Sequence, residues 1–269
     1  MKRSFTIDSD EGLPIRGVID MPEKPKAVVI VIHGFKGFKD WGFFPWLCEY
    51  LSEEGVAACR FDMSRNGIGD NPETFERLDL FADDTYSIQI ADLHRVAEHL
   101  ATIEEFADLS RFVVGHSRGG GVAILGASAI EGLEGVVTWS AIANANRWDA
   151  DAKKKWREDG TSDIVNSRTG QIMKLSTAIL DDFDENADRF NILEVAASLD
   201  VPLLLIHGGS DETVPVEEAE RIDDSARNSS LVVIRSATHT MNAIHPLVTV
   251  PIQLKLAASL TSSFIATRG

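Results

Sequence analysis

Cysteine and long hydrophobic runs are scarce in this sequence, and each scarcity excludes a class of protein. The two cysteines, Cys48 and Cys59, lie in apolar stretches and are too few for a disulfide framework, so buried free thiols are expected. The longest apolar run, residues 27–32, is too short to cross a bilayer. The first residues reach acidic side chains before any apolar run, unlike a signal peptide. We therefore expect a soluble, cytoplasmic protein.

Basic residues are also in the minority. Lysine and arginine total 26 against 42 aspartates and glutamates, which gives a net charge of −16. A negatively charged protein is repelled by phosphate backbones and by anionic lipid headgroups, so neither nucleic acid nor a membrane is expected as a partner. Hydrophobic (44%) and charged (25%) contents are those of ordinary globular proteins, which excludes a disordered or fibrous chain. A length of 269 residues predicts one large domain with room for an insertion, and leaves a homodimer open.

Short β-branched runs alternate along the chain with longer segments of helical spacing. The runs lie at 14–21, 27–32, 56–61, 112–114, 136–139, 201–206 and 231–234. The helical segments lie at 44–54, 80–101, 119–129, 217–226 and 252–265. Runs that are apolar throughout are typical of strands buried on both faces, so the alternation predicts a mostly parallel sheet flanked by helices. The first run and the turn at 22–25 predict an antiparallel edge hairpin.

Residues 144–200 interrupt this alternation, because they contain no buried strand pattern. The stretch is several times longer than an ordinary connection, and such an excess is typical of a lid or a binding insertion. We expect a core of residues 1–143 and 201–269 with a small helical lid at 144–200. Its basic run, 153–157, faces either an anionic substrate or, more commonly for such runs, solvent.

The sequence Gly115-His116-Ser117-Arg118-Gly119 matches G-x-S-x-G, directly after one strand and before one helix. In this context the pattern is typical of a nucleophile elbow. The turn strains the serine backbone, and glycine at the flanking positions allows neighbouring backbone to approach. The helix amino terminus behind the serine favours an oxyanion. Ser117 is therefore the predicted nucleophile; the alternative is a glycine-rich turn with an incidental serine.

A serine nucleophile needs a base and a carboxylate that orients the base. In α/β enzymes with such an elbow, the acid and then the base follow the serine along the chain. Of the seven histidines, His239 fits best, since it follows the last strand by a short loop. Asp211 follows the strand at 201–206 in a glycine-rich turn, with Glu212 as the neighbouring alternative. The backbone N–H groups of Phe35 and Arg118 are the candidate oxyanion donors.

These residues resemble the α/β-hydrolase superfamily over essentially the whole chain, and bacterial serine esterases of the feruloyl or cinnamoyl type most closely. The resemblance rests on H-G-F (33–35), R-F-D (60–62), G-H-S-R-G-G (115–120), H-G-G-S-D-E-T-V-P (207–215), A-T-H (237–239) and, in the lid, N-S-R-T-G-Q (166–171). It implies an eight-stranded sheet with a lid and ester hydrolysis through an acyl-enzyme, without cofactor or metal. Two departures stand out: Arg118 replaces the usual glutamine or methionine, and residues 63–70 replace the commoner R-G-H-G-x-S turn.

The expected activity is hydrolysis of small to medium carboxylic esters with an apolar or aromatic acyl group. Trp148, Trp156 and Phe44 are candidate pocket residues; alternatively, they pack the lid onto the core. A thioesterase or acyltransferase, a small peptidase-like acyl hydrolase, and a non-catalytic binding member of the fold are the alternatives. Serine at the elbow speaks against dehalogenases, epoxide hydrolases and dienelactone hydrolases, since those relatives of the superfamily use aspartate or cysteine there.

Overall fold

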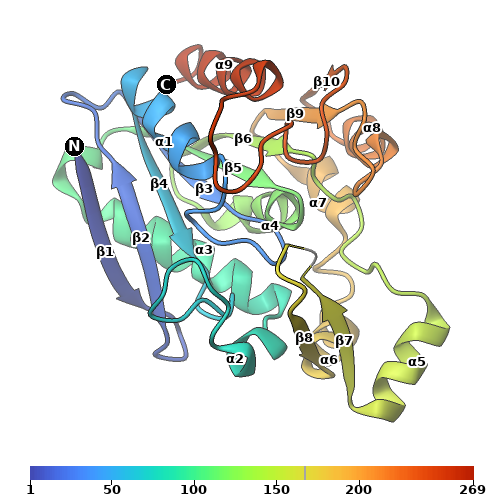
Figure 1. The fold of residues 1–269 in the computed structure, drawn as a ribbon. Helices are drawn as coiled ribbons and strands as arrows, with labels where there is room; N and C mark the ends of the chain where they lie inside the picture. Colours follow the sequence, from blue (N-terminus) through green and yellow to red (C-terminus); the bar gives the residue numbers. More distant parts are fainter. Residues whose placement is uncertain (167) are drawn as a thin grey trace.

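A mostly parallel eight-stranded sheet is the centre of the computed structural model, which describes residues 1–166 and 168–269 (Figure 1). Its strand order is β1-β2-β4-β3-β5-β6-β9-β10, and β2 runs antiparallel to both of its neighbours, β1 and β4. The strands are β1 Lys2–Asp8, β2 Pro14–Asp20, β3 Ala27–Ile32, β4 Val56–Asp62, β5 Ser110–His116, β6 Leu133–Trp139, β9 Leu203–Gly208 and β10 Ser229–Ile234. The predicted fold class is confirmed.

The edge hairpin differs from the prediction. Strand β2 turns back on β1, which precedes it, and Lys2 pairs with Asp20 at one end of the ladder. The chain after the predicted turn at 22–25 continues into β3, while β2 pairs with β4. Residues 2–8 contain no apolar run because alternate residues of this edge strand are exposed, so only half of them need to be apolar.

Helices cover both faces of the sheet. The helices of the core are α1 Phe44–Glu53, α2 Leu78–Ala82, α3 Tyr86–Ala101, η1 Glu104–Phe106, α4 Arg118–Gly126, η2 Ala127–Ala129, α8 Val216–Ser225 and α9 Ile252–Ala266. Helices α1 and α9 contact each other on one face, and α3, α4 and α8 cover the other. The predicted helix at 80–101 is broken, because α2 ends before a new helix begins behind the Thr85 cap.

The central strands are apolar throughout because each face has its own core. On β3, Val28, Ile30 and Ile32 belong to the core beneath α3 and α4. The alternate residues Val29 and Val31 belong to the core beneath α1 and α9. Since every residue of such a strand leaves water, the period-2 alternation of a half-exposed strand disappears.

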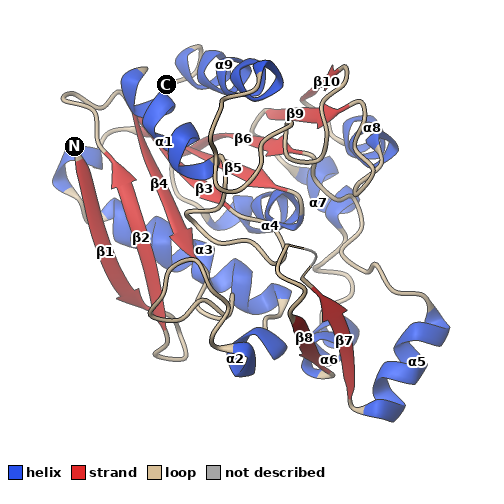
Figure 2. Ribbon diagram, in the orientation of Figure 1, coloured by secondary structure: helices blue, strands red, loops and turns tan. Residues whose placement is uncertain are grey.

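The insertion contains helices, as predicted, and also a two-stranded antiparallel hairpin that was not predicted (Figure 2). Its elements are α5 Ala150–Asp159, β7 Thr161–Val165, β8 Ile172–Ser176, α6 Ala178–Glu185 and α7 Ile192–Ser198. The hairpin packs along α2, whereas α7 packs on α4 and α8. The motif at 166–171 connects the two strands, and its residue 167 lies outside the described residues.

Within the described part of the chain, none of the helices combines the length and the apolar character that a membrane span requires.

Candidate active site

Ser117 occupies the sharp turn between β5 and α4. Its φ of 56° and ψ of −122° lie in the left-handed half of the Ramachandran map, which non-glycine residues rarely adopt. The flanking glycines are required by space: a Cβ at Gly115 would lie 2.2 Å from the Gly119 carbonyl oxygen. A Cβ at Gly119 would lie 2.4 Å from the His33 carbonyl oxygen. The elbow therefore packs against the end of β3 with no room for a side chain.

The contact at Gly119 predicts a large penalty for one methyl group. We expect Gly119→Ala to lower the free energy of unfolding by about 2–3 kcal/mol, because rigid backbone oxygens would have to move. Gly121→Ala is the matched control: the added Cβ would meet side chains and no backbone, with Ile192 at 3.0 Å and Ile142 at 3.2 Å. Urea denaturation of both variants measures the difference, and equal midpoints would contradict it.

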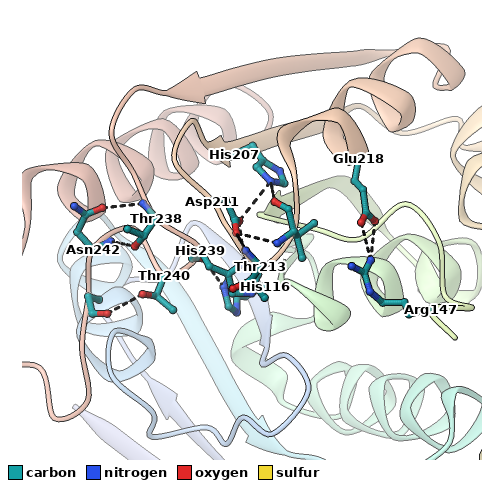
Figure 3. A network of polar contacts seen from close by, with 12 residues as sticks. His116, Arg147, His207, Asp211, Thr213, Glu218, Thr238, His239, Thr240 and Asn242 are labelled. Atoms are coloured by element: carbon teal, nitrogen blue, oxygen red, sulfur yellow. Dashed lines mark hydrogen bonds and ion pairs between the residues drawn. The ribbon is translucent and has the colours of Figure 1, made fainter. Parts of the chain in front are cut away.

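Asp211 and His239 meet at the same edge of the sheet, beyond β9 and β10 (Figure 3). The Nδ1 atom of His239 lies 2.8 Å from Oδ2 of Asp211. The aspartate side chain is fully buried, and that of the histidine is 17% exposed. This hydrogen bond fixes the ring so that Nε2 remains available for a proton from a hydroxyl group.

Close contact between two loops creates this geometry. A Cβ at Gly208 would lie 2.4 Å from the Ala237 carbonyl oxygen, so the loop carrying His239 rests directly on the end of β9. The Ser210 amide also donates to that oxygen, at 2.9 Å. Farther along the loop, Thr238 and Asn242 exchange two hydrogen bonds of 2.9 and 3.0 Å (Figure 3). Sequence reasoning missed Asn242.

The environment of Asp211 favours its charged form. Burial raises the pKa of this carboxyl, but the His239 hydrogen bond and two backbone donors outweigh it and hold the pKa at about 2. The donors are the N–H groups of Thr213 and Val214, each 2.9 Å from Oδ1. A carboxylate that accepts three hydrogen bonds stays ionised at neutral pH.

Two further histidines support the pair rather than competing for its role. Nε2 of His116 donates to the His239 carbonyl oxygen at 2.9 Å, and the two rings lie 4.7 Å apart. Burial, with the adjacent His239 ring, lowers the pKa of His116 to about 3, so His116 is neutral. Nε2 of His207 donates to the Val214 carbonyl at 2.9 Å and lies 3.5 Å from Oδ2 of Asp211. Sequence reasoning did not assign a role to these two histidines. The signals that could have found them are that His116 adjoins Ser117 and that His207 lies at the end of a strand.

The two predicted oxyanion donors are neighbours of the elbow: Arg118 follows Ser117 in the chain, and Phe35 follows Gly34, where an added Cβ would lie 3.0 Å from the Ser117 Cβ. In residues 1–166 and 168–269, the Phe35 and Arg118 amides have no backbone partner. Arg118 begins α4, where the first amides have no acceptor within the helix. The Gly34 carbonyl accepts from Gly37 N–H at 3.0 Å and from His33 Nδ1 at 2.9 Å. Because the peptide is trans, the Phe35 N–H points the opposite way.

The Arg118 side chain turns toward α3. Its guanidinium donates to the Gln89 side chain and the Asp84 carbonyl, at 3.1 and 3.0 Å. It also stacks on the rings of Tyr86 and Phe35, at 4.2 and 5.2 Å from their centroids. The positive charge thus lies against two aromatic rings, one of which is that of Phe35, whose amide is a candidate oxyanion donor.

A sequence profile of the family described as Serine aminopeptidase, S33 matches residues 23–159, just over half of the chain. The chain belongs to this family. It is an α/β hydrolase, as the motifs implied.

Solved structures agree with this fold. Est1E from Butyrivibrio proteoclasticus, solved with ferulic acid bound, is 22% identical, with 98% of each chain covered and a TM-score of 0.75. A putative hydrolase from Agrobacterium vitis S4 is 16% identical, with 98% of this chain and 99% of that chain covered, at a TM-score of 0.76. The esterase domain of a Rhodothermus marinus protein is 20% identical, with 99% of this chain and 97% of that chain covered, at a TM-score of 0.66. At these identities the likeness establishes the fold.

The three pocket candidates of this α/β hydrolase occupy different environments. Phe44 is 3% exposed in the core under α1, and Trp156 is 2% exposed and donates to the Leu175 carbonyl of the hairpin. Phe44 and Trp156 are therefore packing residues, which agrees with the alternative to a pocket role. Trp148 is half-buried and lines a cavity of 370 Å³ together with Arg147 and Glu218.

A second cavity, of 340 Å³, lies between the insertion, including the start of α7, and α8. The two cavities share Asn144, Asn146 and Arg221, and neither is lined by Ser117, Asp211 or His239. Within the described residues, no group of three or more histidine, cysteine or carboxylate side chains is arranged to hold a metal ion.

Proposed function

We propose that this α/β hydrolase cleaves carboxylic esters with an apolar or aromatic acyl group through an acyl-enzyme. The observation that carries the proposal is the 2.8 Å hydrogen bond between His239 and the buried Asp211, on the sheet edge where Ser117 stands in a strained turn. A histidine oriented in this way serves a serine nucleophile, and a binding protein has no use for it.

The reaction follows from these positions. Ser117 Oγ attacks the ester carbonyl carbon while Nε2 of His239 takes its proton, and Asp211 stabilises the resulting imidazolium. The Phe35 and Arg118 amides donate to the tetrahedral oxyanion. His239 then protonates the leaving alcohol, and a water molecule repeats the sequence on the acyl-enzyme to release the acid and free Ser117.

Peptide-bond hydrolysis is the second candidate, because the matching family is described as a serine aminopeptidase. The same triad would act on an amide, but an aminopeptidase must also bind an α-ammonium group. Among the residues that line the described cavities, the three cations are matched by three carboxylates, Asp149, Asp184 and Glu218, so these cavities offer no net negative charge to attract an ammonium ion.

A kinetic panel tests the proposal and separates the alternatives. We expect 4-nitrophenyl esters and methyl hydroxycinnamates to have a higher kcat/KM than acyl-CoA thioesters and aminoacyl 4-nitroanilides. We also expect a fluorophosphonate probe to label Ser117. A higher kcat/KM for an amide or thioester would overturn the ester assignment, and an unlabelled Ser117 in folded protein would favour a binding function.

A further inference from the structure

The loop that follows β3 carries the Phe35 amide, and its own backbone does little to fix it. Among the described residues, positions 34–37 make one backbone–backbone hydrogen bond, the 3.0 Å turn from the Gly37 N–H to the Gly34 carbonyl. Lys36 has a positive φ of 57°, a conformation that is unfavourable for a residue with a side chain. The contacts of the Phe35 side chain therefore decide how firmly its amide is held.

Two side chains from other elements contact the Phe35 ring. The ring of Phe81 on α2 stacks on it, with centroids 5.5 Å apart and planes inclined by 27°. The Arg118 guanidinium lies 5.2 Å from the centre of the Phe35 ring. A cation over the face of an aromatic ring is attracted by the ring's quadrupole, and the attraction is stronger where water is excluded. Arg118 is 5% exposed, so this contact is largely shielded from water.

The Arg118 side chain is itself held in place. Its guanidinium donates to the Gln89 side chain at 3.1 Å and to the Asp84 carbonyl at 3.0 Å, and it lies 4.2 Å from the centre of the Tyr86 ring. The Gln89 amide donates in turn to the Asp84 carboxylate at 2.6 Å. These partners belong to the first turns of α3 and the segment before it, and α3 packs on α4. The guanidinium therefore ties the Phe35 ring to a fixed part of the core.

We propose that the Arg118 side chain is a positioning residue for the oxyanion hole: by stacking on Phe35, it holds the Phe35 amide in the direction that the transition state requires. Arg118 then serves both donors, because its own amide is one of them and its guanidinium orients the other. The proposal rests on ester hydrolysis at Ser117, and it adds a residue that shapes that site.

Arg118→Met tests this role, because it removes the guanidinium and keeps the Arg118 amide. Loss of a whole oxyanion donor lowers kcat by about 10²–10³-fold, and a misdirected donor should cost less. We expect kcat for 4-nitrophenyl butyrate to fall about tenfold, with KM within about twofold, because the donors act on the oxyanion and not on the neutral ester. An unchanged kcat would overturn the proposal.

Arg268→Met is the matched control. The Arg268 guanidinium also lies over an aromatic ring, that of Phe264, at 4.1 Å from its centre. The next residue, Gly269, lies against Ala27 at the start of β3, whereas Ser117 follows the carboxyl end of the parallel strand β5. This stack is therefore at the opposite edge of the sheet, and its loss should change neither kcat nor KM.

Arg118→Lys separates the stack from the charge, since Asp84 is buried close to the guanidinium and is stabilised by its charge. Lysine retains the positive charge, but it lacks the planar guanidinium and its fork of donors. We expect a folded protein, by circular dichroism, in which most of the loss of kcat remains. Full activity in Arg118→Lys would show that charge alone is needed and would overturn the stacking role.

A transition-state analogue gives a readout that a general loss of stability would not change. Ser117 Oγ bonds to the carbonyl carbon of trifluoromethyl hexyl ketone, His239 Nε2 takes the hydroxyl proton, and the former carbonyl oxygen becomes an oxyanion. In Arg118→Met we expect the Ki of this ketone to rise about tenfold, in parallel with the fall in kcat. The Ki of methyl hexyl ketone, which is too unreactive to form the adduct, should stay within about twofold. Equal rises for both ketones would overturn the proposal.

Phe35→Leu distinguishes a failure of this proposal from a failure of the proposed function. It removes the ring and keeps the amide, so adding Arg118→Met to it should lower kcat by no more than about twofold further. The effects of the two substitutions on the urea midpoint should also be less than additive. A protein that hydrolyses no ester refutes the proposed function, and additive urea midpoints would then refute the stack as well. A protein that hydrolyses esters, but in which the two substitutions lower kcat independently, refutes only the positioning role.

Discussion

Replacing Ser117 by alanine is expected to reduce ester hydrolysis by about 10⁶-fold in kcat, to the level left by substrate binding and the oxyanion donors. Without the Oγ atom there is no nucleophile, and no acyl-enzyme forms. The fold should persist, because alanine keeps the Cβ that already lies against Gly34. Hydrolysis of an activated ester, followed at 400 nm, measures the loss, and circular dichroism checks the fold.

Ser140→Ala is the matched control for this variant. Ser140 also follows a strand of the sheet with a positive φ, of 49°, and it is fully buried. Its hydroxyl has no hydrogen-bond partner among the residues that the structure describes, so its removal should cost little. We expect activity within a few-fold of the unmodified protein. More than a few per cent of activity in Ser117→Ala would refute the nucleophile assignment.

Asp211→Asn is expected to lower kcat by about 10⁴-fold, although the shape of the side chain is unchanged. The amide nitrogen of asparagine donates a hydrogen bond to Nδ1 of His239 where the carboxylate accepts one. The ring then carries its proton on Nε2 and cannot act as a base toward Ser117. Glu212→Gln tests the neighbouring carboxylate, which is exposed, and should leave kcat nearly unchanged. A larger loss in Glu212→Gln would transfer the role to Glu212.

Asp211→Asn also tests the environment of the Asp211 carboxylate, through the pH dependence of the free energy of unfolding. Since the pKa of Asp211 is depressed to about 2, its ionised form stabilises the folded state above the unfolded pKa near 4. This contribution is lost as pH falls from about 4 to 2. Asp211→Asn should therefore be less stable than the unmodified protein at pH 7, on the order of 2 kcal/mol, with the gap narrowing below pH 4. A gap that is constant with pH would contradict the assignment.

Local patterns in the sequence were sufficient for the core of the fold. The central strands could be predicted because burial on both faces makes them apolar throughout, as β3 is. The elbow could be predicted because its glycines follow from a backbone approach that leaves no room for Cβ atoms. Asp211 and His239 could be named because the ends of parallel strands meet at one edge of the sheet, where the structure joins them.

Tertiary packing decided what depends on partners distant in the chain. Strand β1 has an ordinary polar alternation and is a strand because β2 pairs with it. His116 and His207 were two of the seven histidines in the sequence, and only the fold shows that they donate hydrogen bonds to the His239 and Val214 carbonyl oxygens. Whether a tryptophan or a lysine of the insertion is buried, paired or exposed to a cavity depends on which side chains the fold brings beside it. The spacing of residues along the chain does not identify these partners, because the energy of a contact depends on distance in space.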